Sequence, residues 1–175
     1  MNRYLVLCTL LAAIGSGVMA GFFYGFSNVV MGALRRISAA AGIAAMQSIN
    51  VVVLNPLFFA LFFGTALLGL VLVVAALVGG AGAGAAAGTA AAGSAEGGLV
   101  FALAGGLVYL VGVIGVTIAR NVPMNHRLAA VGASSPEGAA VWDDYLRRWT
   151  MWNHVRTVGA LVSFVLFVLA LMPRL

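Results

Sequence analysis

One stretch of the chain, residues 142–157 (WDDYLRRWTMWNHVRT), concentrates the side chains that could do chemistry. It holds all three tryptophans, three of the nine arginines, two of the four acids and one of the two histidines. An arginine can stabilise a developing anion, an amide can hold a carbonyl oxygen, and indole faces can bind flat aromatic rings. These residue types permit ligand binding or chemistry, and by themselves they fit an interfacial membrane anchor equally well.

Wound as an α-helix, at about 100° per residue, this stretch separates into two faces. One face is predicted to carry aromatic rings followed by an amide and a guanidinium: Trp142, Tyr145, Trp149, Trp152, Asn153 and Arg156. His154, Asp143 and Arg147 fall on a different side, so His154 turns away from the aromatic face. A simpler alternative is an interfacial belt, in which tryptophans anchor the helix and arginine snorkels to the headgroups.

Further polar groups lie at the same predicted end of the other apolar segments. The whole set comprises Gln47, Asn50, Asn55, Thr117, Arg120, Asn121, Asn125, Trp149, Trp152, Asn153, His154 and Arg156. Amides at membrane depth need hydrogen-bond partners, so they face inward, toward one another or toward a ligand. We expect a small-molecule pocket. The alternative is a polar cap whose members satisfy one another and merely pin the helices together.

The composition indicates that a membrane-embedded scaffold positions these groups. Of the 175 residues, 63% are hydrophobic and 7% are charged, whereas a soluble domain carries about a quarter charged residues. We predict one all-α integral membrane domain over residues 1–175, a four-helix transmembrane bundle with short interfacial helices. The expected spans are residues 4–34, 57–78, 99–119 and 155–172, close to or above the roughly 20 residues that a bilayer core requires.

Capping residues predict where two of the helices begin. Ser38 is a suitable N-cap for a short helix over residues 39–50, because its hydroxyl can accept from a free backbone N–H. Asn55 followed by Pro56 is a start signal for the second span, with asparagine as N-cap and proline in the first turn.

Three further boundaries are predicted from a proline, a capping box and a Gly/Ala-rich segment. Pro123 is expected to close the third span, and Ser134 with Glu137 forms a predicted capping box. From there one continuous helix is expected to reach Met172. Residues 79–98 are rich in glycine and alanine and are expected to form a flexible loop.

A ridge of small residues, Gly17, Gly21 and Gly25, runs along the first span with GxxxGxxxG spacing. Such a ridge lets another backbone approach closely. We expect a neighbouring helix of the same chain to cover it. A homo-oligomer formed through this ridge is the alternative.

The distribution of arginines predicts the orientation in the membrane. Seven of them lie on the side of the first and third loops: Arg35, Arg36, Arg120, Arg127, Arg147, Arg148 and Arg156. Arg3 and Arg174 lie on the other side, so the positive-inside rule places both termini outside and these two loops in the cytoplasm. We expect a bacterial inner-membrane protein whose partner is the lipid bilayer, not nucleic acid, because the arginines mark span ends instead of forming one basic face.

Residues that could hold a metal ion are few and scattered. His126 and His154 are far apart in sequence, and there is no HExxH motif or cysteine cluster. Asp143 pairs at i, i+4 with Arg147, a spacing that usually only stabilises a helix. We therefore predict no cofactor, and a histidine–aspartate metal site is the less favoured alternative.

Three blocks, MQSINVVVLNPLF (46–58), TIARNVPMNHRL (117–128) and WDDYLRRWTMWNHVRT (142–157), resemble in their order the anthrone oxygenase-like membrane protein family. The resemblance covers nearly the whole chain outside the Gly/Ala-rich segment. Named fungal members of that family are assigned the oxidation of polyketide anthrones to anthraquinones with molecular oxygen, without an established cofactor. The resemblance implies a monooxygenase-like oxidoreductase that acts on an activated aromatic or phenolic molecule.

The resemblance also implies which residues form the site. We expect catalytic roles for Arg156, Asn153, His154 and Asn121, and contact with an apolar aromatic small molecule for Gln47, Asn50, Asn125, Arg120, Trp149 and Trp152. Arg156 or Arg120 would stabilise a substrate anion, and His154 or His126 would be the base. The same lining would serve a different class of protein: a non-catalytic membrane protein that binds a lipid, a quinone or another apolar aromatic ligand, or an accessory subunit.

Overall fold

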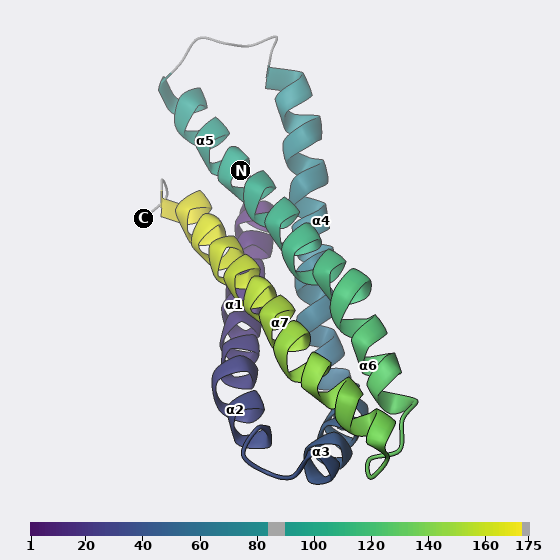
Figure 1. The fold of residues 1–175 in the computed structure, drawn as a ribbon. Coiled ribbons are helices and arrows are strands. Elements are labelled where there is room, and N and C mark those ends of the chain that lie inside the picture. Colours follow the sequence, from purple (N-terminus) through teal and green to yellow (C-terminus); the bar gives the residue numbers. More distant parts are fainter. Residues whose placement is uncertain (84–89, 173–175) are drawn as a thin grey trace.

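Four long helices form a bundle in the computed structural model, which describes residues 1–83 and 90–172 (Figure 1). The long helices are α1 (Arg3–Gly25), α4 (Pro56–Ala83), α5 (Ala90–Tyr109) and α7 (Pro136–Leu171). Helix α1 continues into a π-helical segment, η1 (Phe26–Val30), and then into α2 (Met31–Leu34). Helix α5 continues into two π-helical segments, η2 (Leu110–Gly115) and η3 (Thr117–Asn121), and then into α6 (Val122–Ala129). The described residues contain no strand, which confirms the all-α prediction.

All four long helical segments are long and apolar enough to cross a membrane: Arg3–Leu34, Pro56–Val78, Gly97–Ala129 and Pro136–Leu171. The predicted integral membrane bundle is thereby confirmed. α7 has 36 residues, or about 54 Å at 1.5 Å per residue, against a hydrocarbon core of about 30 Å. Part of α7 must therefore project. Its N-terminal part lies at the end of the bundle where α2, α3 (Ala39–Val52) and α6 gather, which we call the α3 end (Figure 1).

Small residues let the helices approach one another closely in the membrane-spanning part. A Cβ atom at Gly106 of α5 would lie 2.5 Å from the carbonyl oxygen of Gly69 in α4. A Cβ atom at Gly159 of α7 would lie 3.2 Å from the carbonyl carbon of Gly112 in η2. These backbones touch because glycine is present on both sides, as is common where transmembrane helices pack without a hydrophobic driving force.

Two of the three predicted helix caps form as expected. The Ser38 hydroxyl accepts from Ala41 N at 3.3 Å, and Asn55 Oδ1 accepts from Phe58 N at 3.0 Å, so α3 and α4 are separate helices. The third cap is Ser135 instead of Ser134, with its hydroxyl accepting from Gly138 N at 2.9 Å. The predicted cap is wrong by one residue because Pro136 disfavours helical geometry at the residue before it, which makes that residue the boundary.

The prediction of a loop over residues 79–98 is wrong at both flanks of that segment. α4 continues to Ala83 and α5 begins at Ala90, so both flanks of that segment are helical. Alanine is the strongest helix former and outweighs the interspersed glycines there. Residues 84–89 of the predicted loop lie outside the described residues.

Pro123 does not close the third span, contrary to the prediction. It lies in the first turn of α6, and the helical path continues from η3 through it to Ala129. Proline cannot donate to the preceding turn, and its ring collides with the carbonyl of that turn. The π-helical turn directly before it changes the hydrogen-bonding register, so the proline is tolerated inside a long helical segment.

The glycine ridge of α1 is not covered as predicted. A Cβ atom at Gly17 would lie 3.3 Å from the Phe164 ring of α7, but Gly21 and Gly25 have nothing within 4 Å. The buried face of α1 instead follows residues such as Ser16 and Phe23. The ridge lies beside that face, at its edge, and the alternative of a homo-oligomer formed through it stays open.

Candidate functional site

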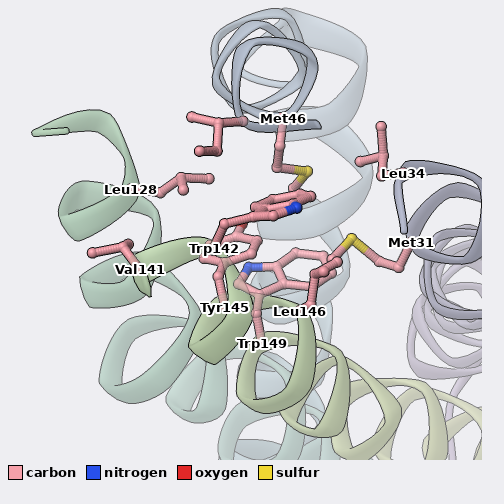
Figure 2. Close-up of a cluster of buried hydrophobic side chains, with 10 residues drawn as sticks. Met31, Leu34, Met46, Leu128, Val141, Trp142, Tyr145, Leu146 and Trp149 are labelled. Atoms are coloured by element: carbon pink, nitrogen blue, oxygen red, sulfur yellow. The ribbon is translucent and has the colours of Figure 1, made fainter. Parts of the chain in front are cut away.

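Three aromatic rings of α7 form a stacked series at the α3 end, which we call the aromatic ladder (Figure 2). The rings of Trp142 and Tyr145 lie 5.7 Å apart at 15°, and those of Tyr145 and Trp149 lie 5.6 Å apart at 16°. Met31 of α2 and Met46 of α3 pack against the ladder. The predicted aromatic face is therefore a buried one, since all three rings are almost fully covered.

One amide oxygen links α6 to the ladder. Asn125 Oδ1 accepts from the Tyr145 hydroxyl and from Trp149 Nε1, both at 2.8 Å. Tyr145 thus joins the predicted Asn125 in one network, although no site role was predicted for Tyr145. Its position on the same helical face as Trp149 was the available signal.

Further along α7 toward its C-terminus, the helix buries the guanidinium of Arg156. Arg156 is 6% exposed, and its Nη2 donates to Asn153 Oδ1 at 2.6 Å while its Nη1 donates to Thr117 Oγ1 at 3.3 Å. The guanidinium lies over the rings of Phe23, at 4.4 Å, and Trp149, at 5.3 Å. Its Nε has no hydrogen-bond partner among the described residues. Ring faces and neutral oxygens therefore surround this charge.

Asn153 fixes the position of that guanidinium. Its Nδ2 donates to the Phe23 carbonyl oxygen at 2.7 Å and to Ser27 Oγ at 2.6 Å, which leaves Oδ1 directed at Arg156. Ser27 lies in η1 and Thr117 in η3, so the two side-chain partners on facing elements come from π-helical turns. Such turns occur often at functional sites, where they re-aim side chains.

No carboxylate among the described residues neutralises Arg156. The ion pairs found in residues 1–83 and 90–172 are Arg127–Asp144 at 3.2 Å and Arg148–Asp144 at 3.8 Å, both at the surface. A buried charge without a counter-ion is costly, and the contacts to ring faces and neutral oxygens compensate for only part of that cost. The site is therefore electrostatically prepared for an anionic group.

A cavity of about 100 Å³, which we call the inner pocket, reaches these polar groups. Five of its lining residues are polar: Asn50, Thr117, Asn125, Asn153 and Arg156. They come from α3, η3, α6 and α7, four segments far apart in the sequence. The structure thus brings together four of the predicted site residues, namely Asn50, Asn125, Asn153 and Arg156.

Two predicted site residues are built into the helix packing instead. Asn121 is buried beside the pocket, where its Nδ2 donates to the Trp149 carbonyl oxygen at 3.3 Å and its Oδ1 has no partner among the described residues. Gln47 donates to the carbonyl oxygens of Leu128 and Val131, at 2.9 and 3.0 Å, and so ties α3 to the end of α6. Neither lines the inner pocket.

The remaining predicted residues lie outside the pocket. His154 and His126 are exposed, and Arg120 is exposed with its guanidinium 4.8 Å from the Trp152 ring. His154 follows Asn153 directly, so the helical rotation of about 100° turns it outward, as the helical wheel predicted. The pair Arg120–Trp152 forms a cation–π contact beside the site, and the structure does not bring these four side chains to Arg156.

Metal-binding side chains do not gather in the described part of the chain. No group of three or more His, Cys, Asp or Glu side chains there is placed to hold a metal ion. His126, His154 and Asp143 are each exposed. The expectation that no cofactor is needed stays a prediction.

Sequence reasoning missed the apolar walls of the pocket. Phe22, Phe23 and Phe26 from the end of α1 and the start of η1, and Phe58 from α4, all line it. The signal was present as the run FFYGF at residues 22–26. Aromatic residues near a span end are so common in membrane proteins that the run does not mark a site by itself.

A family model described as anthrone oxygenase matches residues 57–166, more than half of the chain. The match extends from the first turn of α4 into the second half of α7, so it includes Thr117, Asn125, Asn153 and Arg156. No curated protein and no solved structure matches the chain.

Proposed function

Because the chain belongs to the anthrone oxygenase family, we propose that it oxidises an activated aromatic or phenolic small molecule with molecular oxygen. For an anthrone-type substrate, a methylene group and one O₂ would give a carbonyl group and one water. The observation that carries the proposal is the buried guanidinium of Arg156, which has no carboxylate partner among the described residues and faces a pocket lined by amides.

The proposed mechanism begins with stabilisation of a substrate anion. Loss of a proton from the methylene between two aromatic rings gives a carbanion whose charge spreads onto the carbonyl oxygen. Arg156 beside that oxygen would favour the charged form and lower the pKa of the substrate. Asn50 and Asn125 would orient the carbonyl or hydroxyl groups, and the electron-rich anion can then transfer an electron to O₂.

This mechanism assigns no proton-accepting role to a histidine. Both histidines are exposed and lie outside the pocket, and no lining residue is a histidine or a carboxylate. We propose that the proton passes to solvent at the α3 end, and that the protein contributes anion stabilisation and orientation. The expected role of His154 or His126 as the base is therefore not part of the proposal.

Oxygen uptake by the purified protein tests this function. With 1,8-dihydroxyanthrone as substrate, uptake should exceed autoxidation, and a chelator should leave the rate unchanged. Arg156→Gln should lower the rate about 10²-fold or more, because one lost donor to a developing oxyanion costs about that much. His154→Ala, an exposed change two residues away, is the matched control and should retain nearly full activity.

The alternative outcome is also informative. Binding of the anthrone without oxygen uptake above autoxidation would favour a non-catalytic protein that binds lipids, quinones or other apolar aromatic ligands. Loss of activity on chelation would contradict the absence of a cofactor.

A further inference from the structure

A second, larger cavity of about 430 Å³ lies next to the inner pocket, and we call it the outer pocket. Its walls come from α1, α3 and α4, and most of them are apolar, including Val18, Met19 and Leu61. The two cavities are adjacent and share five lining residues: Phe22, Phe26, Ile49, Val53 and Phe58. Three of these five are phenylalanines, so rings mark the boundary between the two cavities.

The volumes show that the inner pocket alone is too small for the proposed substrate. Pockets that hold small organic ligands usually measure about 300–1,000 Å³. The inner pocket, at about 100 Å³, falls well below that range, and the outer pocket, at about 430 Å³, falls within it. The charge that could stabilise an anion and the space that could hold a fused ring system are therefore in different cavities.

We propose that the outer pocket binds the apolar body of the substrate, while the anion-forming group reaches through the phenylalanine boundary to Arg156. This assignment rests on the proposed function. It makes the substrate an amphiphile: an apolar body of two or more rings, with or without alkyl groups, that carries its ionisable oxygens along one edge. Residues of the outer pocket then decide which substrates are accepted, since they contact the part of the molecule that does not react.

The mouth of the outer pocket indicates how such a molecule arrives. Val18, 46% exposed, lies at the middle of the first membrane-spanning segment, Arg3–Leu34. Val52 and Leu57 on the rim are 69% and 72% exposed. The Val18 side of the rim, in the middle of that segment, faces lipid hydrocarbon, where apolar molecules concentrate. The substrate therefore reaches the site sideways from the bilayer.

Two probes of different size test the assignment by binding, with the protein in lipid nanodiscs. 1,8-Dihydroxyanthrone requires both pockets, whereas 4-nitrophenol, a single ring with an ionisable oxygen, needs only the inner one. Val18→Trp places an indole at the mouth of the outer pocket and should raise the Kd of the tricyclic probe at least about tenfold. That factor corresponds to losing the burial of roughly two methylene groups. The Kd of 4-nitrophenol should change less than about twofold.

Two further variants complete the test. Val74→Trp on α4 is the matched control, because Val74 is 50% exposed and lies outside both pockets; it should leave both affinities unchanged. Val52→Trp, from α3, should repeat the effect of Val18→Trp and serves if that variant does not fold. Arg156→Gln should weaken the binding of both probes.

Several results would overturn the assignment. It is wrong if Val18→Trp and Val52→Trp bind the tricyclic probe as tightly as Val74→Trp does, or if the wild type does not bind that probe. It is also wrong if the substitutions only release a co-purified phospholipid while affinity for the probe stays the same, since a lipid chain would then be the occupant. If the Kd values change as expected but the protein shows no oxygen uptake, the outer pocket binds the probe and the proposed oxidation is wrong.

Discussion

The buried amide of Asn153 connects three structural elements, so its removal should cost a large part of the stability of the bundle. Asn153→Ala deletes donations to the Phe23 carbonyl oxygen and to Ser27 Oγ, which join α7 to α1 and η1. It also deletes the acceptor that holds Nη2 of Arg156 at 2.6 Å. The substitution leaves a guanidinium and a carbonyl group buried with fewer partners.

The expected loss follows from these three bonds. Hydrogen bonds between membrane helices contribute about 0.6 kcal/mol on average and at most about 1.7 kcal/mol, and a bond to a charged group contributes about 1.5–3 kcal/mol. Two of the first kind and one of the second give roughly 3–6 kcal/mol. We expect a value near the lower end, about 3 kcal/mol, because Arg156 lines a pocket that water can enter.

Unfolding by sodium dodecyl sulfate in mixed micelles measures this loss. All three tryptophans lie in α7, two of them in the aromatic ladder, so their fluorescence reports the undocking of this helix. His154→Ala, at the adjacent exposed position, is the control and should change the free energy of unfolding by less than about 0.5 kcal/mol. If the free energy of unfolding of Asn153→Ala lies within about 1 kcal/mol of that of His154→Ala, the amide does not hold α7 in place.

Three other perturbations have expected outcomes. Gly106→Ala should destabilise the protein by several kcal/mol through its clash with a backbone oxygen of α4, whereas Gly21→Ala, in open space, should be neutral or slightly stabilising; thermal unfolding in detergent compares them. Gln47→Ala should cost about 1–2 kcal/mol and increase amide hydrogen exchange in α3, because two hydrogen bonds to the end of α6 are lost. Ser134→Cys and Arg3→Cys, each in a chain without its native cysteine, should react with an impermeant thiol reagent from opposite sides of the membrane, and labelling of Ser134→Cys from outside would invert the proposed orientation.

Much of the fold could be predicted because the membrane simplifies the relation between sequence and structure. Apolar length alone identifies the four spans, since a continuous apolar segment of about 20 residues satisfies its own backbone groups in lipid as a helix. The helical period then placed Asn153 and Arg156 together and turned His154 away, and the burial of these residues agrees. Both inferences depend only on the residues of a single helix and not on how helices pack together.

Contacts that depend on how two helices pack against each other could not be predicted from the sequence. Ser27 and the Phe23 carbonyl oxygen are the partners of Asn153 only because α1 and α7 cross at that height. The glycine ridge was misjudged for the same reason, since small residues permit close packing but do not show which face is packed. Pro123 was misjudged because a π-helical turn depends on tertiary packing and carries no distinctive residue pattern.

The partners of the buried charge also bear on the order in which the protein is made. α7 follows the other three spans in the sequence, and an arginine at the centre of a membrane helix costs about 2.5–3.5 kcal/mol on insertion. The residues on other elements that receive Arg156 and Asn153, namely Phe23, Ser27 and Thr117, all precede α7 in the sequence. When α7 leaves the ribosome, these groups have already been synthesised and delivered to the membrane. The most polar helix can therefore dock against them as it inserts, without waiting for a segment still to be translated.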